Sequence, residues 1–398
     1  MRAASTEGPG GPADVLRLST VPAVFGSACA EQVGRHAAAA LFHRVLLVSD
    51  PGVVAAGHAG RVAEALRAED LHVAIYDRVR ENPTTEHVAD GLAAAQAERC
   101  DALVAVGGGS AMDCAKGVNL LLTNGGRISD YRGDPSADTL RHRKPLLPLI
   151  CVPTTAGTGS EAQSFALISD AANGMKMACG DRRPPGVGLR PILAVLDPEL
   201  TRSVPHAVCS AAGIDAVAHA VETSASRTRC AESRRLSRAA WERLEPALPC
   251  VMRDAGNDDA RADMLLGAHL AGAAIERSML GAAHACANPL TAHFGVTHGV
   301  AVGILLPHVV RFNAANPIAE DAGAPHPYAD LDADADRLAQ RLEALLDAAR
   351  LPRRLRDAGV PAEALPRLAV EAAAQWTAGF NPRSVGPDEL LTVLQKAS

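Results

Sequence analysis

Residues 102–116 read ALVAVGGGSAMDCAK, a short apolar run that passes through three glycines into a helical pattern. The run predicts a buried strand over 102–106, and the glycines predict a tight turn into a helix that begins near Ala111. Backbone N–H groups at such a turn, with the helix dipole behind them, can hold an anion such as a pyrophosphate. A plain tight turn fits these residues as well. The stretch therefore predicts a strand, a turn and a helix, but by itself it does not predict a ligand.

The same alternation of short apolar runs and alanine-rich amphipathic segments extends through the first half of the chain. Further strands are predicted over 44–49, 72–76, 147–152 and 192–196, with helices over 62–68 and 86–98 among the connections. Strands that alternate with helices are typical of βαβ units in a parallel sheet. This half therefore has the pattern of an α/β nucleotide-binding domain.

After Asp197-Pro198 the strand signals stop, and apolar residues recur at three- and four-residue spacing. Helices are predicted over 231–244, 260–275, 333–349 and 362–375, and we interpret the acidic run 333–336 as a solvated helix start. Because 398 residues exceed what one core usually supports, two domains are expected. We predict a flexible tail over 1–14, a nucleotide-binding α/β domain over 15–198, and an all-α domain over 199–398. The residues discussed below assign NAD(P) to the α/β domain and a catalytic metal to the all-α domain.

Composition and charge argue against several classes of partner. Lys and Arg number 39 against 45 Asp and Glu, and this net charge of -6 does not provide the basic surface that nucleic acids require. No apolar run reaches the roughly 18 to 20 residues that cross a bilayer, and residues 1–12 lack the apolar region of a secretory signal. The nine cysteines are scattered without a Cys-x-x-Cys pair, which favours the reducing cytoplasm. We expect a cytoplasmic protein with a small-molecule partner, neither nucleic acid nor membrane as partner, and a homo-oligomeric state, a dimer.

A second polar turn, PTTAGTGSE at 153–161, directly follows the predicted strand 147–152. Ligands of open α/β sheets bind beyond the carboxyl ends of the strands, so two such turns on one sheet favour a nucleotide site. The strand 44–49 is followed by Asp50, whose carboxylate can accept from a ribose hydroxyl and would repel a 2′-phosphate. This position favours NAD over NADP. The alternative for Asp50 is an N-cap ahead of Pro51.

The second half contains residues that suit a metal. Asp215 and His219 are four residues apart in a helical pattern and therefore share one helix face. His284 and His298 lie in Gly- and Ala-rich apolar segments, where a solvated histidine is not expected. Three histidines and a carboxylate can hold a divalent first-row metal and leave a position open for a substrate oxygen. Each histidine alone is better explained as a hydrogen-bonded core residue, so the argument rests on the set.

These motifs together resemble the iron-containing (group III) alcohol dehydrogenase family, within the dehydroquinate-synthase-like superfamily. The resemblance covers nearly the whole chain and rests on VFG (24–26), NPT (82–84), GGGSAMD (107–113), PTTAGTGSE (153–161), MKM (175–177) and NPR (381–383). It implies Fe²⁺, with Zn²⁺ as the alternative, held by Asp215, His219, His284 and His298. It implies cofactor contacts at Asp50, Gly108, Gly109, Ser110, Thr154, Thr155, Thr158 and Lys176.

The chain departs from the family pattern at two places. Many members carry a further histidine four residues after the position of His284, where this chain has Asn288. Asparagine can orient a hydroxyl but cannot relay a proton at neutral pH. We therefore predict catalytic roles for Asn288 and for His293, which would replace the missing relay if it faced the cleft; a surface position for His293 is the alternative. The segment 223–226 also lacks the bulky aromatic residue that members often carry, which predicts a differently shaped substrate pocket.

The resemblance implies hydride transfer between NAD(P)(H) and a small alcohol or aldehyde, with the metal stabilising charge on the substrate oxygen. Within the oxidoreductases, maleylacetate-reductase-like and hydroxyacid-oxoacid transhydrogenase-like activities are the alternatives. A dehydroquinate-synthase-like lyase is the alternative of a different reaction class. Such a lyase is expected to hold its metal with a glutamate and two histidines among several basic residues, and the Asp215/His219 pair argues against it.

Overall fold

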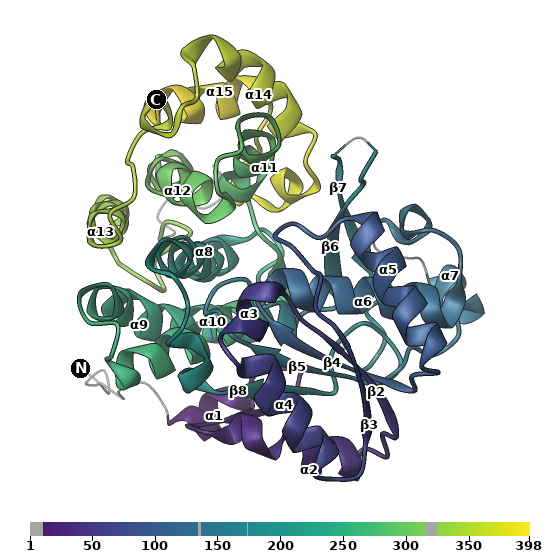
Figure 1. Cartoon of the computed structure of the whole chain (residues 1–398). Helices are drawn as coiled ribbons and strands as arrows, with labels where there is room; N and C mark the ends of the chain where they lie inside the picture. Colours follow the sequence, from purple (N-terminus) through teal and green to yellow (C-terminus); the bar gives the residue numbers. More distant parts are fainter. Residues whose placement is uncertain (1–10, 134–136, 173, 316–324) are drawn as a thin grey trace.

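The computed structural model describes residues 11–133, 137–172, 174–315 and 325–398. A six-stranded parallel sheet forms the first half, in the order β1-β8-β5-β4-β2-β3 (Figure 1). Its strands are β1 (Ala23–Phe25), β2 (Arg44–Val48), β3 (His72–Tyr76), β4 (Ala102–Gly107), β5 (Leu149–Pro153) and β8 (Leu193–Leu196). The predicted parallel sheet and its five strands are confirmed. Sequence periodicity missed β1, because three half-buried residues are too short to show an alternation.

Helices cover both faces of this sheet, and the alternation along β4 shows why. Leu103 and Ala105 pack in one cluster with residues of α5 and α6, whereas Val104 and Val106 pack in another with residues of α2 and α4. Successive side chains of a strand point to opposite faces, so a strand covered on both sides needs a continuous apolar run. The helices of this half are α1 (Pro12–Leu16), α2 (Val33–Ala39), α3 (Pro51–Ala55), α4 (His58–Arg67), α5 (Thr85–Ala97), α6 (Gly109–Asn124) and α7 (Ala137–His142).

A β-hairpin outside the main sheet was not predicted from the sequence. Its antiparallel strands are β6 (Phe165–Ser169) and β7 (Lys176–Gly180), and it projects from the α/β half toward the helical half (Figure 1). The hairpin is tied to the turn at 82–84, because the N–H of Ser169 donates to the carbonyl of Pro83 at 2.8 Å. It therefore presents Lys176, the first residue of β7, from a fixed position.

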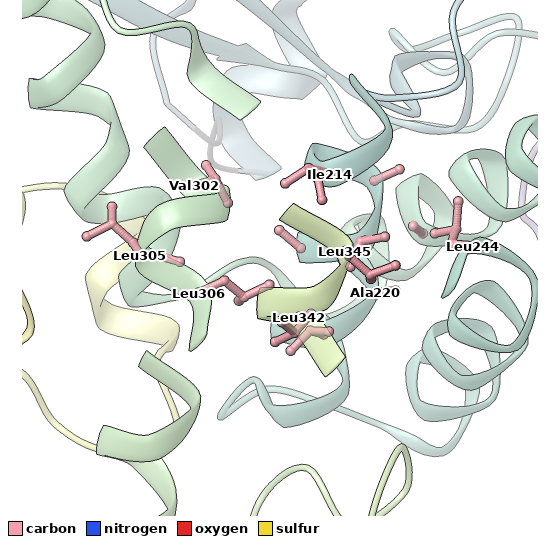
Figure 2. Packing of buried hydrophobic residues seen from close by; sticks show 14 of the residues in the cluster. Ile214, Ala220, Leu244, Val302, Leu305, Leu306, Leu342 and Leu345 are labelled. Carbon is pink, nitrogen blue, oxygen red and sulfur yellow. The ribbon is translucent and has the colours of Figure 1, made fainter. Parts of the chain in front are cut away.

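The second half is helical, as predicted. Its helices are α8 (His206–Ala225), α9 (Ala231–Arg253), α10 (Asp258–Ser278), α11 (Ala282–Phe294), α12 (His298–Ala314), α13 (Ala335–Ala348), α14 (Leu365–Ala373) and α15 (Pro387–Lys396). Short 3₁₀ segments are η1 (Cys29–Gln32), η2 (Ile128–Tyr131), η3 (Ser160–Ala162), η4 (Pro198–Thr201), η5 (Leu355–Ala358), η6 (Ala362–Ala364) and η7 (Trp376–Phe380). Figure 2 shows the apolar core between four of these helices. The labelled side chains are Ile214 and Ala220 of α8, Leu244 of α9, Val302, Leu305 and Leu306 of α12, and Leu342 and Leu345 of α13. None of the described helices is both long and apolar enough to span a bilayer.

Two helices illustrate how the predicted boundaries differ from the structure. The helix predicted over 231–244 continues to Arg253 through two prolines, because its buried face packs along α10 and α8. The helix predicted over 362–375 begins only at Leu365, where a proline occupies the first turn, the position at which helices tolerate it. The acidic run supplies the N-cap of α13: Asp334 accepts from two N–H groups of the first turn, as a solvated helix start should.

The two halves meet where the turn 153–161 rests on the helices. A side chain on Gly157 would lie 2.8 Å from the Cβ of Ala212 in α8, and one on Gly159 would lie 2.6 Å from the Cα of Gly272 in α10. Glycine at both positions permits backbone contact between the sheet edge and the helical half. The carboxyl edge of the sheet therefore borders directly on α10 and on α8, the helix that carries Asp215 and His219.

Candidate active site

The two polar turns of the sheet edge are in contact. A Cβ on Gly109 would lie 2.6 Å from the Oγ1 of Thr158, and one on Gly108 would lie 3.2 Å from the Oγ1 of Thr155. Helix α6 begins at Gly109 without any side-chain cap, so its first N–H groups, Ser110 among them, keep their donors for another acceptor. Glycine at both positions therefore allows the backbone of one turn to contact the hydroxyls of the other.

Buried charges lock these turns together. The Oδ1 of Asp113, one turn into α6, accepts from the Oγ of Ser160 at 2.7 Å. The Nζ of Lys116 donates to the carbonyls of Ser160 and Phe165 at 2.7 and 2.8 Å. Thr154, which is buried, donates its N–H to the carbonyl of Gly107 at 2.9 Å. These hydrogen bonds connect the two turns of the sheet edge to each other.

Asp50 serves as the N-cap of α3. Its Oδ1 accepts from the N–H groups of Gly52 and Val53 at 2.9 and 3.0 Å. Its other oxygen, Oδ2, lies 3.2 Å from the place of a Cβ on Gly107, so the carboxylate also borders the glycine turn. The capping role, which the sequence left as an alternative, is present. It does not conflict with a ribose contact, because both capping bonds use Oδ1.

Lys176 reaches between the two halves. Its Nζ donates to the Oδ1 of Asn82 at 3.2 Å, and Asn82 adopts a left-handed backbone conformation at φ 54°. Burial lowers the pKa of Lys176, and the carboxylates of Asp113 and Asp215 act against that shift. The ammonium group therefore lies within electrostatic range of both the nucleotide turn and the helix that carries Asp215.

The residues predicted to bind metal converge on one buried carboxylate. The Oδ1 of Asp215 lies 3.5 Å from the Nε2 of His219, 3.4 Å from that of His284 and 3.8 Å from that of His298. Asp215, His284 and His298 each offer a ligand atom within 4.8 Å of the others. His219 stacks on His284 with ring centroids 4.9 Å apart but falls outside that tightest set. Three helices, α8, α11 and α12, supply these four side chains.

The polar atoms of this cluster fit a cation. The Oδ1 of Asp215 and the Nε2 of His284 are buried without a hydrogen-bond partner among the described residues, which is costly unless another group occupies the space between them. Burial lowers the pKa of His219, and burial lowers that of His298 to about 3, so both rings are neutral ligands at neutral pH. Burial by itself would raise the pKa of Asp215, but the surrounding histidines hold that pKa below its ordinary value. A neutral imidazole and an ionised carboxylate are the forms that bind a divalent metal.

One residue of the site was missed by the sequence reasoning. Glu222 is 3% exposed and lies 2.6 Å from the Nδ1 of His284 through its Oε2. Although burial opposes protonation, the Glu222 and Asp215 carboxylates raise the pKa of His284 to about 9 in the metal-free chain. A signal was available, because Glu222 follows Asp215 and His219 at helical spacing on one face of α8.

Asn288 and His293 occupy different surroundings on α11. Asn288 lies one turn beyond His284, is half-buried, and donates from Nδ2 to the Oε1 of Gln375 at 3.1 Å. His293 lies nine residues beyond His284, which places it on the opposite side of the helix. Its Nε2 lies 2.5 Å from Glu371, and both side chains are 34% exposed. The geometry therefore favours the surface position for His293 and corrects its assignment as a cleft-facing relay.

Comparison with known proteins agrees with this architecture. The family model described as iron-containing alcohol dehydrogenase matches residues 21–198, and the model of its C-terminal region matches residues 209–398. Alcohol dehydrogenase 4 of Saccharomyces cerevisiae is 32% identical over 376 residues, which cover 94% of this chain and 96% of that protein. The chain belongs to the iron-containing alcohol dehydrogenase family.

Solved structures show the same fold. A 1,3-propanediol oxidoreductase matches with a TM-score of 0.85 at 32% identity, covering 96% of this chain and 99% of that one. A sulfoacetaldehyde reductase from Bifidobacterium kashiwanohense, solved with NAD⁺, matches with a TM-score of 0.85 at 27% identity, covering 95% and 97%. These matches confirm the predicted class, an NAD(P)-linked oxidoreductase of the alcohol and aldehyde type. They do not support the alternative of a lyase.

Proposed function

We propose that this protein binds one Fe²⁺ per chain at Asp215, His219, His284 and His298 and uses NAD to interconvert a restricted small aldehyde and its alcohol. The observation that carries the proposal is the convergence of three Nε2 atoms within 3.4 to 3.8 Å of one buried Asp215 oxygen. Imidazole and carboxylate ligands suit Zn²⁺ as well, so the choice of iron rests on the family.

The side chains of the chain have separable roles in this reaction. A bound metal would supply Lewis-acid stabilisation of the negative charge that develops on the substrate oxygen. The glycine turn and the first N–H groups of α6 would bind the pyrophosphate, and Lys176 would contribute positive charge beside it. The sheet edge and the helices behind it would orient the nicotinamide toward the substrate carbon, and orientation of this kind lowers the barrier to hydride transfer. No side chain needs to act as a nucleophile.

The preference for NAD over NADP rests on Asp50. Its carboxylate borders Gly107, and a 2′-phosphate placed there would meet like-charge repulsion. We expect Asp50→Ser to relax the preference, since serine keeps an N-cap for α3 but removes the charge. Initial rates with NADH and NADPH test this expectation. Equal use of both coenzymes by the wild type would contradict it.

The restriction on substrate rests on Asn288. Asparagine cannot relay a proton at this position, and the contact of His293 with Glu371 at the surface argues against His293 as a substitute, which leaves a water chain or a weakened proton-transfer step. We therefore expect slow turnover of simple primary alcohols. The test is a screen of NADH-dependent reduction across short aliphatic, acidic and phosphonate-bearing aldehydes, with oxidation of ethanol and propanol and with Asn288→His alongside. Fast ethanol or propanol oxidation by the wild type, unaffected by Asn288→His, would contradict the proposal.

Metal content tests the site itself. Elemental analysis of the wild type should give one iron or zinc per chain, and His284→Ala should lose most of it. His293→Ala is the matched control, because it removes a histidine from the same helix at the surface. Metal retained in full by His284→Ala, or lost equally by both variants, would overturn the site.

A further inference from the structure

We propose that Glu222 is a positioning residue that fixes which ring nitrogen of His284 faces the metal and thereby sets the affinity of the site. This inference rests on the metal role proposed above. It concerns a side chain that would not touch the metal, since its carboxylate lies on the Nδ1 side of the ring and the cluster lies on the Nε2 side.

The contacts of Glu222 define the tautomer of His284. An ionised carboxylate can only accept hydrogen bonds, so the 2.6 Å contact requires the proton to reside on Nδ1. A neutral ring with its proton on Nδ1 presents its lone pair on Nε2. That atom is the buried one without a partner, 3.4 Å from the Oδ1 of Asp215. The hydrogen bond also restricts rotation of the ring, so the Nε2 atom is held in one direction before a metal displaces any proton from it.

Glu222 also holds the start of the helix that carries His284. Its Oε2 accepts from the N–H of Gly281 at 3.1 Å, and its Oε1 accepts from the N–H of Ala283 at 2.7 Å. A Cβ on Gly281 would lie 3.1 Å from the Oε1 of Glu222, so glycine lets the carboxylate approach. One side chain of α8 thus fixes both the backbone and the ring at the N-terminus of α11. Since α8 also carries Asp215 and His219, three parts of the site share one helix face.

A simple capping role is the alternative, and the structure contains its own comparison. The Oδ1 of Asn381 accepts from the N–H of Ala282 at 3.3 Å, at the same helix start. The described partners of Asn381 also include Asn313 and the carbonyl of Arg383, but no ring of the metal cluster. If Glu222 acts only as a cap, loss of either side chain should affect metal binding through stability alone.

The experiment measures metal affinity separately from stability. Metal-free wild type, Glu222→Gln and Asn381→Ala are titrated with Zn²⁺ against a competing chelator at pH 9, where a proton on His284 competes little with the metal, and their unfolding is measured in the absence of metal. Loss of such an outer hydrogen bond weakens metal binding by about 10- to 100-fold, and we expect this for Glu222→Gln. Asn381→Ala should be destabilised yet bind within about 3-fold of the wild type. Co²⁺ loading adds a spectroscopic readout, because the visible bands should change in Glu222→Gln and not in Asn381→Ala.

Each outcome decides between the hypotheses. Glu222→Gln with wild-type affinity and Co²⁺ spectrum, or an affinity loss equal to that of Asn381→Ala, would overturn the positioning role while leaving the proposed metal site intact. A wild type that binds neither metal would overturn the proposed site and this inference with it. If Glu222→Gln does not fold, Gly281→Ala replaces it. Its methyl would lie 3.1 Å from both the Oε1 of Glu222 and the Oδ1 of Asn381, so its affinity is compared with that of Asn381→Ala to isolate the effect on Glu222. Several-fold weaker Zn²⁺ binding is then expected, and unchanged binding would refute the role.

Discussion

Gly299 offers the sharpest test of how helix packing builds the site. It is the second residue of α12, directly after His298, and a Cβ there would lie 2.0 Å from the carbonyl oxygen of Ala211 in α8. Contacts of this kind essentially never fall below 3.0 Å, so Gly299→Ala must separate the two helices by about 1 Å. Ala211 lies one turn before Asp215, and the 3.8 Å between Asp215 and His298 should lengthen accordingly.

The expected consequences differ in kind and can be measured apart. Overpacking of this size costs about 1–3 kcal/mol of stability, and a misplacement of about 1 Å in a reacting group can cost about 100-fold in rate. We expect Gly299→Ala to bind metal weakly and to lose about two orders of magnitude in kcat. Denaturant unfolding, chelator competition and steady-state kinetics provide these values.

Gly34→Ala is the matched control. Its Cβ would lie 1.9 Å from the carbonyl oxygen of Ala65, where α2 crosses α4 on the outer face of the sheet, far from α8 and α12 (Figure 1). This variant should lose comparable stability while keeping its metal and its kcat. Equal loss of metal binding in both variants, or an unimpaired site in Gly299→Ala, would refute the reasoning.

Three further predictions follow from single side chains. Asp50→Ala should lower the free energy of unfolding by about 1 kcal/mol, because it removes the N-cap of α3, whereas Asp50→Ser should keep the cap. Equal free energies of unfolding for the two variants in a urea titration would contradict the capping role. Because the pKa of His284 is raised to about 9 in the metal-free chain, a proton competes with the metal below that pH. The Zn²⁺ affinity should therefore fall by up to about tenfold per pH unit from pH 9 to 7, with proton release on binding, and an affinity independent of pH in that range would contradict this. Lys176→Met should weaken NADH binding in a fluorescence titration without weakening Zn²⁺ binding, since Lys176 places positive charge near Asp215; parallel loss of both would argue for a merely structural role.

The sequence determined the features that depend on local periodicity and local chemistry. The continuous apolar run over 102–106 requires a strand covered on both faces, and the glycines after it allow the backbone to turn into α6. The helical spacing of Asp215 and His219 places both on one face of α8. The same periodicity, applied nine residues beyond His284, would have placed His293 on the far side of α11. That position is therefore predictable from the sequence.

Only the tertiary structure decided which distant residues meet. Glu222 and His284 are 62 residues apart in the chain, and their contact depends on how α8 and α11 pack. Neither periodicity nor motif spacing encodes that packing, because it is set by the apolar faces of several helices at once. For the same reason the sequence could name Asp215, His284 and His298 as a set but could not place their atoms around one carboxylate. The local patterns fixed which side chains each element presents, and the burial of apolar surface between the elements fixed where those side chains converge.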